Sequence, residues 1–577
     1  MLAMHFAGRP QLEPARLDAG SAPRLAGALA HFECHPRQTC EAGDHTLHIG
    51  EVVDFDYRRG DLLGFACGRF VTIAEPSLGL EHLLCPRSTQ PGGTMGARSG
   101  RQYLDDLARR RIHVQIDGDT TIGDTSDHPA FAGVARSYAE LFDMQVSPEF
   151  RDVLTYPSPT PGDPVGTSFL VPENAADLAR RREAFRTWAN HSFGMLGRTG
   201  DYLNSSLMAL GRAKSWFAQA DPAFGENIER YYQQVREEDL LLTHTLIPPQ
   251  INRSVSGGQQ GGGALMAHVV REDDNGIVVR GARMLATIAP ISDELLVFPS
   301  TVLRGTPEDE PYSFAFAIPT DTPGLRFVAR QPLHSNRSAF DEPLASRFEE
   351  SDCVVVFDDV HVPYERVFVL RDPELCNCFY SRTGATTHMT HQVVTRTVTK
   401  SEFFLGLLSE LADAIGIDGF QHIQQDIAEV INAVEIGKAL LQSAESQATT
   451  NEFGVHTPLW APLNTARNWY PKASQRFPEI VRKFAASGLM ALPGEQDVFG
   501  AAAADVEKYL QGKAIDGPER VRLFKLAFDA SASSFAGRQN LYEHFFFGDP
   551  VRMAGALVNT YDRTDLRKRI QDFLHRD

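Results

Sequence analysis

The fold is decided around residues 353–363, which read Cys-Val-Val-Val-Phe-Asp-Asp-Val-His-Val-Pro. This apolar, β-branched run predicts a strand, and its closing proline suits an edge strand or the exit from a sheet. Similar short runs precede it at residues 276–280, 295–298 and 314–318, separated by Asp, Gly and Pro. Residues 249–375 are therefore predicted to form an antiparallel sheet or β-barrel domain.

The segments on both sides of this β domain show helical spacing instead. Upstream, Leu178, Phe185 and Trp188 recur with basic residues between them, so residues 101–248 are predicted to be a mostly helical domain. Downstream, residues 390–577 are predicted to be a helical bundle. The stripe that indicates it consists of Phe420, Ile423, Ile427, Val430, Val434 and Leu441.

The first hundred residues form a separate region. Short alternating runs such as residues 46–53, bounded by glycines, predict β-strands within residues 1–80. Residues 81–100 are rich in Gly, Ser, Thr and Pro, as is typical of a linker.

Composition excludes several classes of protein. The chain has 577 residues, and its 56 Lys and Arg against 74 Asp and Glu give a net charge of −18. This charge speaks against nucleic acids or an anionic membrane surface as partners. We find no apolar run long enough for a membrane helix and no secretory leader pattern, and the seven cysteines are sparse and odd in number. The sequence therefore predicts a cytoplasmic protein with reduced thiols.

Known cofactor and metal signatures are missing, so the chemistry must come from other residues. There is no dinucleotide-binding glycine fingerprint, no phosphate-binding loop and no zinc spacing, and metal catalysis is disfavoured. If a helix starts near Thr199, Arg198 lies at its edge and Tyr202 one turn on, and both could face one cavity. A guanidinium and a phenol suit an anionic or phenolic ligand. The alternative is an Arg-Asp pair that holds a helix N-terminus.

A second polar segment begins at His244 and continues through a Pro-Pro break to Arg253. A chain leaving a helix there would expose several hydrogen-bond donors. A lone histidine is more often a satisfied structural residue, so the segment alone leaves both interpretations open.

Five motifs, in this order, resemble the 4-hydroxyphenylacetate 3-hydroxylase family, and in particular its pyoverdine-chromophore hydroxylase branch. They are Gly-Arg-Thr-Gly-Asp-Tyr (197–202), His-Thr-Leu-Ile-Pro-Pro-Gln-Ile-Asn-Arg (244–253), Gly-Ala-Arg-Met-Leu-Ala-Thr (281–287), Leu-Ala-Ser-Arg-Phe-Glu-Glu (344–350) and Phe-Ala-Gly-Arg-Gln-Asn-Leu-Tyr-Glu (535–543). The resemblance implies an α+β, acyl-CoA-dehydrogenase-like fold, with an N-terminal helical domain, a middle β-barrel and a C-terminal four-helix bundle. It also implies a homo-oligomer, a tetramer or dimer.

The resemblance implies the oxygenase component of a two-component flavin-dependent monooxygenase. Such an enzyme takes FADH2 from a separate NAD(P)H-flavin reductase, forms a C4a-hydroperoxide with O2, and hydroxylates a phenol ortho to its hydroxyl. By the motif match, Arg198, Tyr202 and His244 are the catalytic and substrate-binding residues. The match also gives flavin contacts at Gln250, Ile251, Asn252, Arg253, Thr287, Arg538 and Gln539, and substrate contacts at Ser300 and Thr301.

Residues 30–70 resemble the C-terminal half of short-chain flavin reductases, in which a Gly-Asp-His turn, here ending at His45, approaches the nicotinamide and flavin rings. Only about half of such a domain is present, so we expect a remnant without reductase activity. A self-sufficient reductase-oxygenase and a non-catalytic flavin-binding scaffold are the alternatives. An iron-sulfur dehydratase, a relative of the same superfamily, is excluded because residues 86–352 hold no cysteine.

Overall fold

The computed structural model describes residues 96–576 apart from 161, 253, 255, 256, 300–302 and 304, together with six strands between residues 17 and 73. The chain divides into two units, Met1–Gly93 and Thr94–Asp577. The described strands of the first unit pair as antiparallel neighbours, β3 with β4 and β5 with β6, and the predicted strand at 46–53 lies within β4. The strands are β1 (Leu17–Asp18), β2 (Arg24–Leu25), β3 (Ala30–Ala42), β4 (His45–Tyr57), β5 (Leu62–Ala66) and β6 (Arg69–Ile73).

The second unit contains a β domain of two sheets. The larger sheet has the order β12-β13-β17-β16-β7-β8, antiparallel except for the parallel pair β16 and β7. The predicted strand at 353–363 is β17, at the centre of this sheet. The strands are β7 (Ile112–Ile116), β8 (Asp119–Gly123), β12 (His268–Asp273), β13 (Gly276–Thr287), β16 (Leu325–Ala329) and β17 (Asp352–Pro363).

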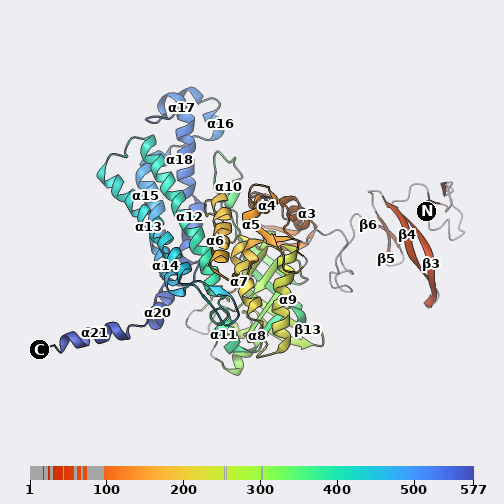
Figure 1. Ribbon diagram of the computed structural model, residues 1–577. Coiled ribbons are helices and arrows are strands. Elements are labelled where there is room, and N and C mark those ends of the chain that lie inside the picture. The colour runs from red at the N-terminus through yellow and green to blue at the C-terminus, as the bar shows by residue number, and fades with distance from the viewer. Residues whose placement is uncertain are drawn as a thin grey trace. The chain divides into compact units, whose positions relative to one another are not determined.

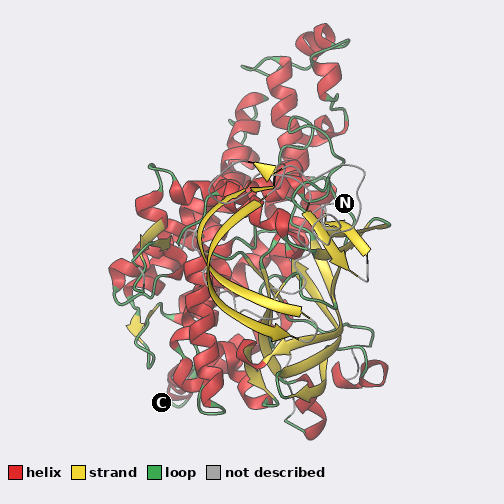
Figure 2. Ribbon diagram, turned by 90° about the vertical axis from the view of Figure 1, so that its right-hand side faces the viewer, coloured by secondary structure: helices red, strands yellow, loops and turns green. Residues whose placement is uncertain are grey.

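The smaller sheet has the order β11-β14-β15-β18, in which only β11 and β14 are parallel. Its buried face packs on the larger sheet, where the rings of Phe316 and Phe357 meet edge to face with centroids 6.3 Å apart. Figure 2 colours the strands yellow and the helices red. The strands are β11 (Leu242–Thr245), β14 (Glu294–Val297), β15 (Phe314–Pro319) and β18 (Val367–Leu370).

The helices that precede the β domain pack beside it (Figure 1). The first of these helices begins with a capping box between Ser99 and Gln102. The helices are α3 (Gly100–Arg109), α4 (Ala132–Val146), α5 (Arg151–Leu154), α6 (Ala175–His191), α7 (Gly200–Arg212), α8 (Lys214–Phe217) and α9 (Pro222–Glu238), with a small hairpin of β9 (Thr155–Pro157) and β10 (Pro164–Gly166).

The C-terminal helices form a bundle around the long helix α12 (Ala385–Ala414), which has the largest buried face among them. α20 and α21 lead away from this bundle (Figure 1). The other helices are α11 (Pro373–Arg382), α13 (Gln421–Ser446), α14 (Trp460–Ala473), α15 (Arg476–Ala485), α16 (Glu495–Val498), α17 (Ala503–Tyr509), α18 (Gly517–Ser531), α19 (Ser534–Phe545), α20 (Pro550–Thr560) and α21 (Thr564–Leu574), and a short hairpin joins β19 (Thr449–Thr450) to β20 (His456–Thr457).

The predicted fold class, with its order of helices, β domain and helical bundle, is confirmed, and two details differ. Strands β7 to β11 all arise inside the segment predicted as mostly helical, and His244 lies on β11 instead of at the end of a helix. β7 forms because residues 112–116 alternate buried and more exposed side chains and extend the larger sheet. The predicted bundle stripe lies on α13, but Phe420 is its N-cap and 55% exposed, so it takes no part in the core.

Within the part of the chain that the structure describes, no helix combines the length and apolarity required to cross a membrane. The same residues contain no group of three His, Cys, Asp or Glu side chains arranged to hold a metal ion.

Candidate active site

The predicted catalytic residues come together at the start of α7. Arg198 lies in the loop before this helix, Thr199 is the N-cap, and Tyr202 lies in the first turn. The hydroxyl of Tyr542, on α19, donates to the Gly197 carbonyl at 2.9 Å. A Cβ on Gly197 would come within 2.4 Å of the Tyr542 ring, so only glycine fits here. The loop and α19 are therefore in direct contact.

The guanidinium of Arg198 is packed among aromatic rings. Its Cζ lies 4.5 Å from the ring centre of Phe546, 4.7 Å from that of Tyr202 and 5.5 Å from that of Tyr542. Its Nε and Nη1 are buried, and neither has a hydrogen-bond partner among the residues that the structure describes. A buried donor without a partner is costly, so these two groups are suited to an acceptor on a ligand.

The structure contradicts the alternative in which Arg198 pairs with Asp201. Asp201 accepts a hydrogen bond from the Thr199 hydroxyl at 2.6 Å and another from the Gln392 amide at 3.0 Å. Burial raises the pKa of Asp201 to about 6. Asp201 thus bonds to neutral side chains and makes no ion pair with Arg198.

His244 faces Tyr202 from β11. The two ring centres are 5.8 Å apart, and each residue is only 6% exposed. Burial, and next the positive charge of Arg198, lowers the pKa of His244 well below its ordinary value of 6.5. The imidazole is therefore neutral at pH 7, so it can accept a proton at one nitrogen while it donates a hydrogen bond from the other.

The predicted flavin contacts occupy two places. Thr287, at the end of β13, is buried, and its carbonyl accepts a hydrogen bond from Thr243, the neighbour of His244, at 2.6 Å. Gln250, Ile251 and Asn252 lie on an exposed loop after β11. Their flavin contacts stay predictions. Three further predicted contacts, Arg253, Ser300 and Thr301, lie outside the described residues.

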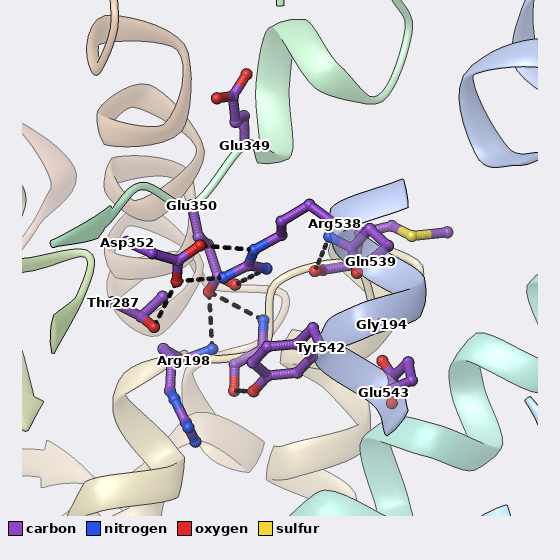
Figure 3. A network of polar contacts seen from close by, with 12 residues as sticks. Gly194, Arg198, Thr287, Glu349, Glu350, Asp352, Arg538, Gln539, Tyr542 and Glu543 are labelled. Carbon is purple, nitrogen blue, oxygen red and sulfur yellow. Dashed lines mark hydrogen bonds and ion pairs between the residues drawn. The ribbon is translucent and has the colours of Figure 1, made fainter. Parts of the chain in front are cut away.

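Arg538 and Gln539, also predicted to contact the flavin, have partners within the chain. Arg538 binds both oxygens of Asp352, at 3.0 and 2.9 Å, and reaches Glu350 at 3.2 Å (Figure 3). Gln539 donates to the Met195 carbonyl at 3.1 Å and accepts from Lys400 at 2.7 Å. These partners hold both side chains in place, and their flavin contacts stay predictions.

Sequence reasoning missed Phe546, Tyr542 and Glu350 as parts of the site. Glu350 and Tyr542 stand inside recognised motifs, but nothing in those motifs says which loop they contact. Phe546 belongs to a run of three phenylalanines that ends at Gly548, and this unusual run is the only signal it carries. The Phe546 ring lies beside the site, with its centre 5.7 Å from that of the Tyr202 ring.

Comparisons with known proteins agree with this geometry. Residues 99–369 match the family model described as the 4-hydroxyphenylacetate 3-hydroxylase N terminal domain, and residues 376–575 match that of the C terminal domain. The chain belongs to the 4-hydroxyphenylacetate 3-hydroxylase family. Residues 1–74 match a flavin reductase like domain, as the resemblance of this segment suggested.

Relatives within this family align with most of the chain. The 4-hydroxyphenylacetate 3-monooxygenase oxygenase components of Geobacillus sp. and Thermus thermophilus are each 45% identical to the chain, over 83% of it and 97% of their own length. The pyoverdin chromophore biosynthetic protein of Pseudomonas aeruginosa is 32% identical over 78% of the chain and 89% of its own length. The chain is thus more similar to the Geobacillus and Thermus oxygenase components than to this member of the branch named from its motifs.

A solved family structure has the same fold. The crystal structure of an oxygenase component complexed with FAD and 4-hydroxyphenylacetate is 45% identical and has a TM-score of 0.79, over 83% of this chain and 98% of its own. A 4-hydroxybutyryl-CoA dehydratase at 19% identity shares the fold with a TM-score of 0.74.

Proposed function

We propose that this protein is the oxygenase component of a two-component monooxygenase that uses FADH2 and O2 to hydroxylate a phenol ortho to its hydroxyl. The observation that carries this proposal is the buried group of Arg198, Tyr202 and His244, in which a guanidinium keeps two unpartnered N–H groups beside a phenol and a neutral imidazole. A phenolic oxygen satisfies all three of these groups. The solved relative that holds FAD and 4-hydroxyphenylacetate supports the same assignment.

The roles of the three residues follow from their chemistry. Arg198 favours the phenolate form of the substrate, because its charge lies in a site lined by rings that keep water away. Tyr202 donates a hydrogen bond to the same oxygen or to a neighbouring acceptor. His244, neutral at pH 7, takes the phenolic proton and leaves an electron-rich ring.

The cofactor of this reaction is FAD, and the residues near the site fit it in part. The proposed flavin contacts are Gln250, Ile251, Asn252, Arg253, Thr287, Arg538 and Gln539. Ser300 and Thr301 are the proposed contacts to the substrate tail. When bound, reduced FAD activates O2 for transfer of one oxygen atom to the ring. The chain's contribution is to hold the phenol, remove its proton and exclude water.

The partners we propose are a separate NAD(P)H-flavin reductase and further copies of this chain, in a dimer or tetramer. α20 and α21 support self-association, since no residue of α21 is buried and both helices carry exposed apolar side chains. These side chains are Val551, Val558, Leu566, Ile570, Phe573 and Leu574, each 49–80% exposed.

A substrate screen tests the proposal. The purified chain is mixed with FAD, NADH and an unrelated flavin reductase, and a panel of phenols that includes 4-hydroxyphenylacetate is added under air. We expect one or more phenols to gain the mass of one oxygen atom and to give a catechol. If FAD binds but no phenol on a broad panel is oxidised, the chain is a flavin-binding scaffold; if NADH is consumed without added reductase, it is a self-sufficient fusion.

A further inference from the structure

Glu350 stands at the junction of three parts of the molecule, between α10 (Ala345–Phe348) and β17. Its side chain is fully buried, and one oxygen, Oε1, accepts hydrogen bonds from the backbone N–H groups of Gly197 and Arg198 at 2.9 and 2.7 Å. The same oxygen accepts from the Tyr138 hydroxyl on α4 at 3.0 Å, and Oε2 accepts from Arg538 on α19 at 3.2 Å. One carboxylate thus ties the loop before α7 to two other elements.

The loop that Glu350 holds is the one that carries Arg198. The Arg198 guanidinium has no salt bridge among the described residues, and it is held by ring contacts with Tyr202, Tyr542 and Phe546. A cation without a carboxylate partner takes its direction from its backbone and from packing. The hydrogen bond that the Arg198 backbone N–H donates to Glu350 therefore helps to set where the guanidinium lies.

Arg538 links Glu350, through Asp352, to Thr287, which is one of the proposed flavin contacts. It binds Asp352 through two parallel hydrogen bonds, and the Thr287 hydroxyl donates to the same carboxylate at 2.8 Å (Figure 3). Glu350 and Asp352 are two residues apart, and Arg538 bridges them. The chain of contacts from Thr287 through Asp352, Arg538 and Glu350 to Arg198 joins the two sides of the proposed site.

We propose that Glu350 is a positioning residue for hydroxylation. By bonding to the backbone of Gly197 and Arg198, it holds the Arg198 guanidinium at a fixed position relative to Thr287. This inference rests on the proposed function and adds a residue to it. Glu350 does not touch the substrate. It acts by fixing the loop, so that the phenolic oxygen and the flavin-side residues meet at the correct separation.

Glu349 provides a matched control for this proposal. It is the preceding residue, 4% exposed, and it also accepts two backbone N–H groups, from Leu333 at 2.6 Å and His334 at 2.7 Å, together with one guanidinium, from Arg330 at 2.7 Å. Figure 3 shows its side chain pointing away from Arg198. Glu349 therefore makes the same kinds of contact to a different loop. Its link to the Glu350 network runs through Arg330, which also donates to Asp352 at 3.3 Å and to the Glu350 carbonyl at 2.7 Å.

The test compares Glu350→Gln with Glu349→Gln and the wild type. Glutamine is nearly isosteric, but it replaces one acceptor oxygen by an NH2 group. That NH2 must face either the two backbone N–H groups or the Arg538 guanidinium, all of which are donors, so the link between the loop and Arg538 is broken in either orientation. We expect Glu350→Gln to lower the yield of hydroxylated phenol per FADH2 oxidised by at least about 10-fold, since small misplacements of a binding group cost that much. Hydrogen exchange of the Gly197 and Arg198 amides should accelerate in this variant, and Glu349→Gln should leave both measurements close to wild type.

The outcomes separate the two claims. If the wild type oxidises no phenol, the proposed function fails and this inference with it. If the wild type is active, and the two glutamine variants either lose the same fraction of their yield or both keep it, the positioning role is overturned. Should Glu350→Gln not fold, Tyr542→Phe removes the hydrogen bond to the Gly197 carbonyl while it keeps the ring. That variant must also lower the yield per FADH2 for the inference to stand.

Discussion

At the residue scale, the sequence identified Arg198, Tyr202 and His244 through a motif match, but it did not identify what surrounds them. Tyr542 contacts the Gly197 carbonyl across 345 residues, and no local pattern predicts a contact of that range. The state of Arg198, stacked on rings with two unpartnered donors, likewise depends on Phe546 from the far end of the chain. Residue types were thus predictable, whereas their environment was not.

Arg198 is expected to require a guanidinium and not merely a positive charge. A lysine ammonium cannot lie flat against three rings and offers no planar pair of donors, so Arg198→Lys should lower the rate of phenol hydroxylation by about 100-fold. Arg520→Lys is the matched control, because Arg520 stacks 4.4 Å from the ring centre of Phe524 in the bundle. Equal rates in Arg198→Lys and the wild type would contradict this role.

His244 makes stability depend on pH in a defined direction. Its pKa is lowered in the folded state, so the unfolded chain binds the proton first as the pH falls below about 6.5, and the folded state is weakened. The His244→Gln variant lacks this contribution. Between pH 7 and 5.5 its free energy of unfolding, measured with urea, should fall less than that of the wild type, by up to about 1.4 kcal/mol per pH unit. Parallel pH profiles would show that His244 is not buried as described.

At the element scale, periodicity predicted the elements whose own side chains build the core. α13 has its buried positions at Ile423, Val430, Val434 and Leu441, as the stripe indicated. β7 and β8 were not separated from their helical surroundings. Among the described strands β8 pairs only with β7, and β7 joins the sheet by pairing with β16, a strand some 200 residues later. Pairing with a distant strand leaves only a weak local signal.

The loop before α7 is expected to tolerate no side chain at Gly197. A Cβ there meets the Tyr542 ring at 2.4 Å, so Gly197→Ala should destabilise the protein by about 1–3 kcal/mol through overpacking, and should also lower hydroxylation. Gly406→Ala is the control, since Gly406 lies on α12 with no atom within 4 Å of an added Cβ. That variant should gain up to about 1 kcal/mol from helix propensity. Thermal melts of both variants check the prediction, and a Gly197→Ala protein as stable as the wild type would refute it.

At the scale of the whole molecule, the order of helical domain, β domain and bundle could be predicted because each part has its own period. The bridge that Arg538 makes between Asp352 and Glu350 could not, since it joins the β domain to the bundle through residues whose motifs specify no partner. Sequence patterns therefore predicted the parts of the molecule better than the contacts between them.

Self-association through the C-terminal helices is a prediction at the same scale. Replacing Leu566, Ile570 and Phe573 by serine should convert the proposed dimer or tetramer to a smaller species in light scattering, because these exposed side chains form one apolar face of α21. Replacing Arg567, Arg569 and Asp572 on the same helix should leave the mass of the assembly unchanged. An unchanged mass in the first variant would show that α21 does not hold the assembly together.

The most direct test of the central claim follows the oxygen atom. The chain is supplied with FADH2 by a separate reductase, and 4-hydroxyphenylacetate is added under 18O2. We expect a catechol with one 18O atom from the wild type and almost none from Arg198→Ala or His244→Ala. A wild type that oxidises FADH2 but leaves every phenol unlabelled, or variants that label it as well as the wild type, would contradict the claim that Arg198 and His244 serve the hydroxylation.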